Sequence, residues 1–202
     1  MLGSPPVAQR RRAALGFTVR TGRVIVVALA APVEAPEILA KARIDVATTF
    51  DEGAVFHSAQ KLPLEKARTF VEESEDRFVE RARTALGAFI AGLDAKIVAT
   101  AMAAPARKSL PPFASILKAH PLLHAAEGEL YRRVFTEGAA AVGPRPDRIG
   151  PDTLAKSTAS ALGLAPATLA AQLATMGKAA GRPWAADQKQ AALAAWLALA
   201  RA

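Results

Sequence analysis

The first 46 residues carry three apolar patterns that are typical of β-strands. In residues 15–19, Leu, Phe and Val alternate with Gly and Thr, and residues 38–46 alternate charged with apolar side chains. Between them, residues 24–29 form a continuous run rich in Val, which is typical of a strand buried on both faces. Gly22 suits a tight turn between the first two strands because glycine adopts positive φ at little cost. These patterns predict an antiparallel three-stranded meander.

The rest of the chain alternates helical and extended patterns. After an expected loop over residues 47–62, apolar residues recur every three or four positions from 64 to 93, which predicts a long helix. Residues 96–103 predict a fourth strand, and residues 148–149 predict a short fifth one. Further helices are expected from Phe113 or His120 to Ala141, open to a break at Pro121, and at 153–162, 168–176 and 186–201.

The order of these elements predicts the fold class. A chain of 202 residues is long enough for one full hydrophobic core. We expect one α/β domain over residues 14–202, with a five-stranded mixed sheet in which the antiparallel meander is followed by parallel strands, flanked by helices. Residues 1–13 precede it as a flexible basic arm.

The overall charge of the chain is strongly basic. It contains 26 Lys and Arg residues against 18 Asp and Glu, for a formal net charge of +8. This balance favours a polyanion such as nucleic acid as partner, with a protein partner or a second copy of the chain as alternatives. Cysteine is absent, which excludes disulfides and thiolate metal sites. The longest apolar run, Val24–Pro32, is too short to span a bilayer, so we expect a cytoplasmic protein without a membrane segment.

Two short motifs add to the order of elements. Residues 15–18, Leu-Gly-Phe-Thr, resemble the motif that begins the first strand of RuvC-type resolvases, a branch of the ribonuclease-H-like superfamily. Residues 187–194, which begin with Asp187, resemble the opening of the C-terminal helix in that family. The resemblance covers about residues 14–200 and implies the ribonuclease-H-like fold.

The resemblance also implies a chemistry that these residues do not support. Enzymes of the family hold two divalent metals with clustered carboxylates, and the metals drive phosphodiester hydrolysis. Here the expected acid positions hold Thr18, Ala101 and Gln190, and of the final pair only Asp187 remains. We therefore expect a catalytically degenerate domain that needs no cofactor, and no nuclease activity.

Two hypotheses keep a metal in the protein. In the first, Asp187 and Glu127 form a rebuilt acidic site, and the protein is a hydrolase that uses Mg²⁺ or Mn²⁺. In the second, His120, His124 and Glu127 share one face of a continuous helix, at spacings of four and three, and bind zinc or iron. The break at Pro121 would remove His120 from that face. A third alternative is a structural or regulatory protein whose basic charge is incidental.

The leading hypothesis is that the degenerate domain binds nucleic acid or a protein partner. Trp184 could add a stacking surface for a base. The cations expected to contact phosphates are Arg10, Arg11, Arg12, Arg20, Arg23, Arg107, Lys108, Lys178, Arg182 and Lys189.

Overall fold

The computed structural model describes residues 10–107 and 109–202. One five-stranded mixed sheet runs through it, in the order β3-β2-β1-β4-β5. The first three strands pair antiparallel, and β4 and β5 continue the sheet in parallel from β1, so the predicted topology is confirmed. The strands are β1 (Arg11–Arg20), β2 (Arg23–Ala30), β3 (Glu37–Asp45), β4 (Ala95–Ala103) and β5 (Asp147–Ile149).

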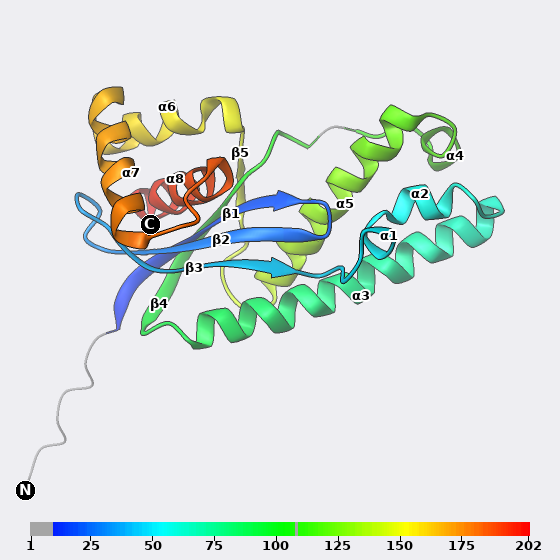
Figure 1. Ribbon diagram of the computed structural model, residues 1–202, viewed down its shortest axis with the longest axis horizontal. Helices are drawn as coiled ribbons and strands as arrows, with labels where there is room; N and C mark the ends of the chain where they lie inside the picture. The colour runs from blue at the N-terminus through cyan, green and yellow to red at the C-terminus, as the bar shows by residue number, and fades with distance from the viewer. Residues whose placement is uncertain (1–9, 108) are drawn as a thin grey trace, which may run out of the picture.

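Helices cover both faces of the sheet. The long helices α3 and α5 pack on one face, and α6, α7 and α8 pack on the other. Figure 1 shows that α3 and α5 continue past the ends of the strands, to the side where α1, α2 and α4 lie. The helices are α1 (Phe50–Gly53), α2 (Val55–Ala59), α3 (Leu64–Ala91), α4 (Phe113–Ile116), α5 (His120–Ala140), α6 (Pro151–Leu162), α7 (Pro166–Ala180) and α8 (Ala186–Arg201). Among the described residues no single helix is long and apolar enough to cross a membrane, although α6 and α7 pass that test as a pair bent by 100°.

Alternate residues of β1 belong to the two separate cores. Leu15 and Phe17 are buried against α3 and α5, whereas Ala14 belongs to the core beneath α8. Gly16 lies on the α8 side, where a Cβ atom would stand only 1.8 Å from the carbonyl oxygen of Ala191. The absence of a side chain therefore lets α8 approach the middle of the sheet.

The expected boundary of the N-terminal arm needs a correction. Strand β1 begins at Arg11, so residues 11–13 belong to the sheet, and residues 1–9 lie outside the described part of the chain. The carbonyl of Arg12 accepts a hydrogen bond from the Ala31 N–H at 2.9 Å. Strand pairing with β2 and β4 satisfies the backbone hydrogen bonds of these residues. This pairing outweighs the high positive charge, which had suggested an arm outside the sheet.

Two helical segments replace the loop that was expected over residues 47–62. Helix α1 begins after Thr49, whose hydroxyl accepts a hydrogen bond from the Glu52 N–H at 3.1 Å. Helix α2 follows directly and buries Val55 and Phe56. The prediction of a loop was wrong because both helices are shorter than the repeat from which helical periodicity is recognised.

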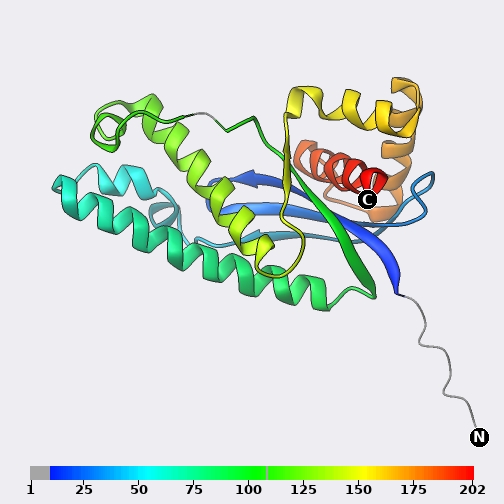
Figure 2. The ribbon, with the colours of Figure 1, turned by 180° about the vertical axis from the view of Figure 1, so that it is seen from behind.

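Helix α5 starts at His120 and contains Pro121 in its first turn. Proline is tolerated there because the first N–H groups of a helix have no partner within the helix. The considered break at Pro121 does not occur, and His120 and His124 belong to the same helix. Figure 2, seen from behind, shows this helix running without interruption toward the sheet.

Candidate functional site

Thr18, the position on the first strand where the resemblance predicts an acid, lies on the α8 side of β1. Thr18 is 1% exposed, and its hydroxyl is a buried group for which the described residues provide no hydrogen-bond partner. In the register of the parallel pair, Ala103 lies beside Thr18, and Ala101 lies beside Gly16. The neighbouring strand thus contributes methyl groups and no carboxylate at this level.

The one remaining acid of this position is already paired. Asp187 lies in the first turn of α8, where the positive end of the helix dipole stabilises a carboxylate. Arg20, from the end of β1, forms a bidentate ion pair with Asp187, with Nη2 at 2.6 Å from Oδ1 and Nε at 3.3 Å from Oδ2. Gln190 follows three residues later and offers an amide. A buried hydroxyl, two methyl groups and one neutralised carboxylate do not fit two divalent metal ions.

Glu127 does not join Asp187 in a rebuilt acidic site. It is held on α5, which covers the opposite face of the sheet from α8. Its side chain is 4% exposed and accepts hydrogen bonds from the Phe56 and His57 N–H groups at 3.1 and 3.4 Å. The sequence could not reveal this separation because it depends on which face each helix covers.

A group of cations lies on the sheet face beside the start of α8. Arg20 and Arg23 are register partners in the β1–β2 hairpin, and Arg43 and Lys41 project to the same side from β3. Arg43 is bound by its neighbour Asp45, with Nη2 at 2.7 Å from Oδ1. We call Arg20, Arg23, Lys41 and Arg43 the basic sheet face. Sequence reasoning missed Lys41 and Arg43 as binding residues, although their alternation with apolar residues indicated exposure.

The loop between α7 and α8 borders this face. Lys41 Nζ donates to the carbonyl oxygens of Gly181 and Pro183, which places Arg182 next to it. Lys189 is exposed in the first turns of α8, and Lys178 is exposed near the end of α7. Of the predicted contact residues, Arg182 is therefore brought close to the basic sheet face, and Lys178 and Lys189 are exposed on the two helices that the loop connects.

Trp184 does not present a free stacking surface. Its indole packs on Gly177 of α7, where an added Cβ would stand 2.2 Å from Trp184 Cδ1. The Trp184 Nε1–H is buried, and the described residues offer it no acceptor. Lys41 Nζ lies over the partly buried ring, 5.9 Å from its centroid. Packing against α7 therefore explains why a large aromatic side chain occurs at this position.

Other predicted contact residues lie elsewhere. Arg10, Arg11 and Arg12 stand at the opposite end of β1 from Arg20, and Arg11 pairs with Glu37 at 2.7 Å. Lys108 lies outside the described residues. The ten predicted cations therefore do not form one continuous surface.

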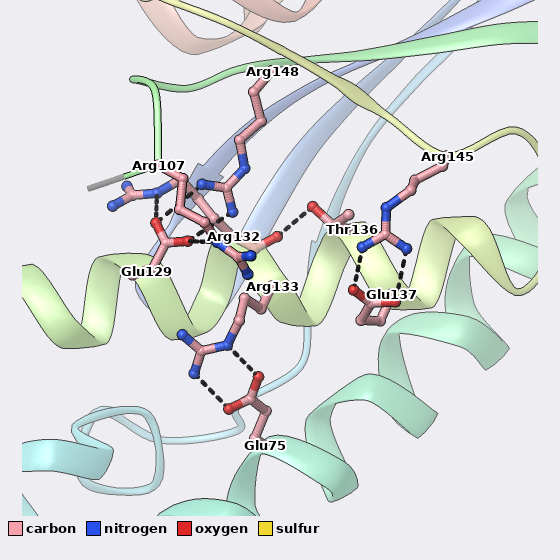
Figure 3. Close-up of polar contacts among 9 residues, drawn as sticks. All are labelled: Glu75, Arg107, Glu129, Arg132, Arg133, Thr136, Glu137, Arg145 and Arg148. Carbon is pink, nitrogen blue, oxygen red and sulfur yellow. Dashed lines mark hydrogen bonds and ion pairs between the residues drawn. The ribbon is translucent and has the colours of Figure 1, made fainter. Parts of the chain in front are cut away.

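Arg107 belongs to an ion-pair network around Glu129 (Figure 3). The Glu129 carboxylate is 8% exposed and contacts Arg148 at 2.9 Å, Arg132 at 3.1 Å and Arg107 at 3.4 Å. Burial raises the pKa of Glu129, but hydrogen bonds from Arg148 and Arg132 outweigh this effect, and the pKa lies below its ordinary value. The guanidinium groups of this network hold α5 to β5 and to the loop that follows β4.

A second polar cluster lies at the start of α5. All three histidines of the sequence, His57, His120 and His124, gather there from α2 and α5. His57 Nδ1 is 2.9 Å from Glu127 Oε1. The expected set of His120, His124 and Glu127 thus gains His57, which lies in the segment that was expected to be a loop.

A cleft of about 660 Å³ joins this cluster to the basic sheet face. His57, His124 and Glu127 line one part of it, and Arg23 and Arg43 line another. Next to the cleft, the buried hydroxyl of Tyr131 donates a hydrogen bond to the carbonyl oxygen of Gly53, a lining residue, at 2.7 Å. Burial, together with the charge of Glu127, raises the pKa of Tyr131 well above its ordinary value, so it stays a neutral donor.

Comparison with known proteins bears on the fold. No family model matches this chain, and no curated protein matches its sequence. The structure resembles Thermus thermophilus RuvC in complex with a Holliday junction substrate, with 12% identity and a TM-score of 0.52, over 92% of this chain and 91% of that one. A second T. thermophilus RuvC structure matches with 11% identity and a TM-score of 0.50 over the same shares. The chain therefore has the five-stranded ribonuclease-H-like fold seen in RuvC.

Proposed function

We propose that this protein is a RuvC-like domain that binds the sugar–phosphate backbone of nucleic acid without cleaving it. The observation that carries the proposal is the ion pair between Arg20 and Asp187, at 2.6 Å, on the sheet face where an active relative would hold metal ions. An arginine at this position neutralises the remaining acid and cannot activate a water molecule as a metal does.

Binding through phosphates is supported by the charges around that ion pair. The basic sheet face, Arg182 and Lys189 together contribute six cations, and the carboxylates among them are Asp45 and Asp187. The guanidinium of Arg20 is half exposed, so it can contact a phosphate while it remains paired with Asp187. Such contacts position a nucleic acid without reading its sequence.

A structural role is the second candidate, and it has its own observation. Several arginines of this chain form ion pairs between secondary-structure elements: Arg148 of β5 binds Glu129 of α5, and Arg133 of α5 binds Glu75 of α3. If the remaining cations serve the same purpose, the protein has no affinity for nucleic acid. The two candidates therefore differ in one measurable property.

We expect binding to duplex, junction and single-stranded DNA with little sequence preference and steep salt dependence. Engagement of about four phosphates gives a slope of about −3 to −4 in log affinity against log salt. Arg23→Ala and Lys189→Ala should each reduce the steepness of the slope by about 1, because each removes one phosphate contact. Fluorescence anisotropy with labelled DNA from low to physiological salt measures these slopes.

The matched control is Arg83→Ala. Arg83 is half exposed and paired with Glu80 on α3, so its removal changes the net charge equally but away from the basic sheet face. It should leave the slope unchanged. Absence of binding at low salt would rule out the proposal and favour the structural role, and equal losses for Arg83→Ala and Arg23→Ala would show that the basic sheet face is not the binding surface.

A further inference from the structure

The three histidines form a cluster with the geometry of an incomplete metal site. One ring nitrogen each from His57, His120 and His124 lies within 4.8 Å of the other two. The ring centroids are 4.5 Å apart for His120 and His124, and 4.8 Å apart for His57 and His124. We propose that these three side chains bind one divalent transition-metal ion, for which Zn²⁺ is the best fit.

Helix geometry explains two of the ligands. His120 and His124 are separated by four residues, so they lie one turn apart on the same side of α5. Pro121 keeps this arrangement because it is accommodated in the first turn, where it removes no helical hydrogen bond. Both side chains are exposed, so each can rotate toward a shared ion.

The third ligand is held by a buried carboxylate. Glu127 Oε1 lies 2.9 Å from His57 Nδ1 and also accepts from the Phe56 N–H at 3.1 Å. When Nδ1 carries the proton that Glu127 accepts, the lone pair of His57 is on Nε2, which is the form that binds a metal. Glu127 therefore acts as a positioning residue rather than as a ligand, which differs from the set expected from sequence.

The distances are those of a site that closes on binding. Zn–N bonds of about 2.0–2.1 Å place the nitrogens of a tetrahedral site about 3.4 Å apart. The present separations of up to 4.8 Å shorten to this value when the exposed rings of His120 and His124 turn. Three imidazole nitrogens favour Zn²⁺ over Mg²⁺, which prefers oxygen ligands.

A metal held here keeps one position for a further ligand. Three protein ligands leave a tetrahedral ion one coordination position open, as in catalytic rather than structural zinc sites. His57 and His124 line the cleft of about 660 Å³, so solvent or a small ligand reaches the ion through it. The proposal does not depend on nucleic-acid binding, because none of its ligands belongs to the basic sheet face.

The test is metal binding by untagged protein, since these are its only histidines. We expect one Zn²⁺ per chain in a competition titration with a chromophoric chelator, and Co²⁺ should give the intense visible bands of a tetrahedral site. His120→Asn and His124→Asn should abolish the bands. Glu127→Gln should lower affinity by about 10- to 100-fold because it removes the charged partner of His57.

Lys118→Ala is the control, because Lys118 is exposed just before α5 and is not a ligand. It should bind metal as the original protein does. Thermal unfolding without metal checks that each variant is folded, and added Zn²⁺ should raise the midpoint for the original protein and for Lys118→Ala but not for His120→Asn or His124→Asn. The proposal is overturned if the original protein takes up no Co²⁺, or if His120→Asn and His124→Asn bind as tightly as Lys118→Ala.

Discussion

At the residue scale, two carboxylates of this protein are kept ionised in different ways. Hydrogen bonding from the Thr48 N–H, at 2.7 Å, is the largest effect on Glu52, and Arg81 adds a contact at 2.6 Å, so that its pKa falls to about 2. Glu129 is more buried, and hydrogen bonds from arginines, Arg148 foremost, outweigh the cost of burial. In each case the neighbours decide the charge state more than exposure does.

The low pKa of Glu52 predicts a pH dependence of stability. A carboxyl with a pKa of about 2 in the folded protein and an ordinary value of 4.5 stabilises the fold above pH 4.5. This contribution is lost as the pH falls from 4.5 to 2, because protonation breaks the contacts with Thr48 and Arg81. Glu52→Gln should lower the free energy of unfolding at pH 7 by about 1–2 kcal/mol and make no difference near pH 2.

Urea unfolding of both proteins at several pH values between 2 and 7 measures this difference. Asp51→Asn is the matched control, since Asp51 is exposed in the same helix. An Asp51→Asn variant with the same pH-dependent loss as Glu52→Gln would contradict the explanation and indicate a general effect of charge on α1.

At the scale of elements, the contact between α8 and β1 determines how closely α8 packs on the sheet. Gly16 lies in the middle of β1, and the nearest atoms to an added Cβ are the Ala191 carbonyl oxygen at 1.8 Å and the Ala195 nitrogen at 2.4 Å. Both are backbone atoms, which cannot rotate away as a side chain does. The small residues of α8 continue this close approach, and Asp187 is brought to Arg20 as a result.

Gly16→Ala should therefore destabilise the fold severely. We expect a loss of more than about 4 kcal/mol in the free energy of unfolding, because α8 must move away from the sheet. Gly143→Ala is the control, since nothing lies within 4 Å of the corresponding Cβ, and it should change stability by less than about 0.5 kcal/mol. Chemical denaturation followed by circular dichroism compares the two, and a similar stability for both variants would show that α8 does not need this contact.

At the scale of the whole molecule, the sheet and the helices that flank it match the fold of RuvC. At the positions where the resemblance predicts acids, β1 carries Thr18 and β4 carries Ala101, and Arg20 is paired with Asp187 at 2.6 Å. A shared fold does not by itself imply a shared chemistry, so the activity must be tested at this site.

We expect the protein to leave duplex, junction and single-stranded DNA intact in Mg²⁺ or Mn²⁺. The expectation follows from Thr18, Ala101 and Gln190 at the expected acid positions and from the pairing of Asp187 with Arg20, which leave too few carboxylates for two metal ions. Incubation of purified protein with end-labelled substrates checks it. Cleavage that disappears in Asp187→Ala would contradict the degenerate site, and cleavage that survives this change would move the activity to another site or to a contaminant.

The fold was largely predictable from sequence because its signals are local. Alternation in residues 15–19 and 38–46, with a buried run between them, defines the meander without knowledge of distant contacts. The start of β1 at Arg11 and the short helix α2 escaped prediction. At both places tertiary contacts, such as strand pairing at Arg12 and burial of Phe56, decide the structure.

The site was predictable only in part because its contacts are distant in sequence. Thr18 and Asp187 could be named from motifs, but Arg20 binds Asp187 across 167 positions, and no local pattern reports such a contact. His57 and Glu127 are likewise 70 positions apart. Periodicity fixes which face a side chain occupies, and it does not determine which other segment covers that face.

The ion pair between Arg20 and Asp187 has a consequence for the redesign of this protein. Introducing a carboxylate by Thr18→Asp would give Arg20 a second anion to neutralise rather than create a vacancy for a metal ion. Removing Arg20 first would leave Asp187 without its counter-charge and still provide too few ligands. A designed metal site at this position therefore requires the removal of Arg20 together with the addition of carboxylates on more than one element.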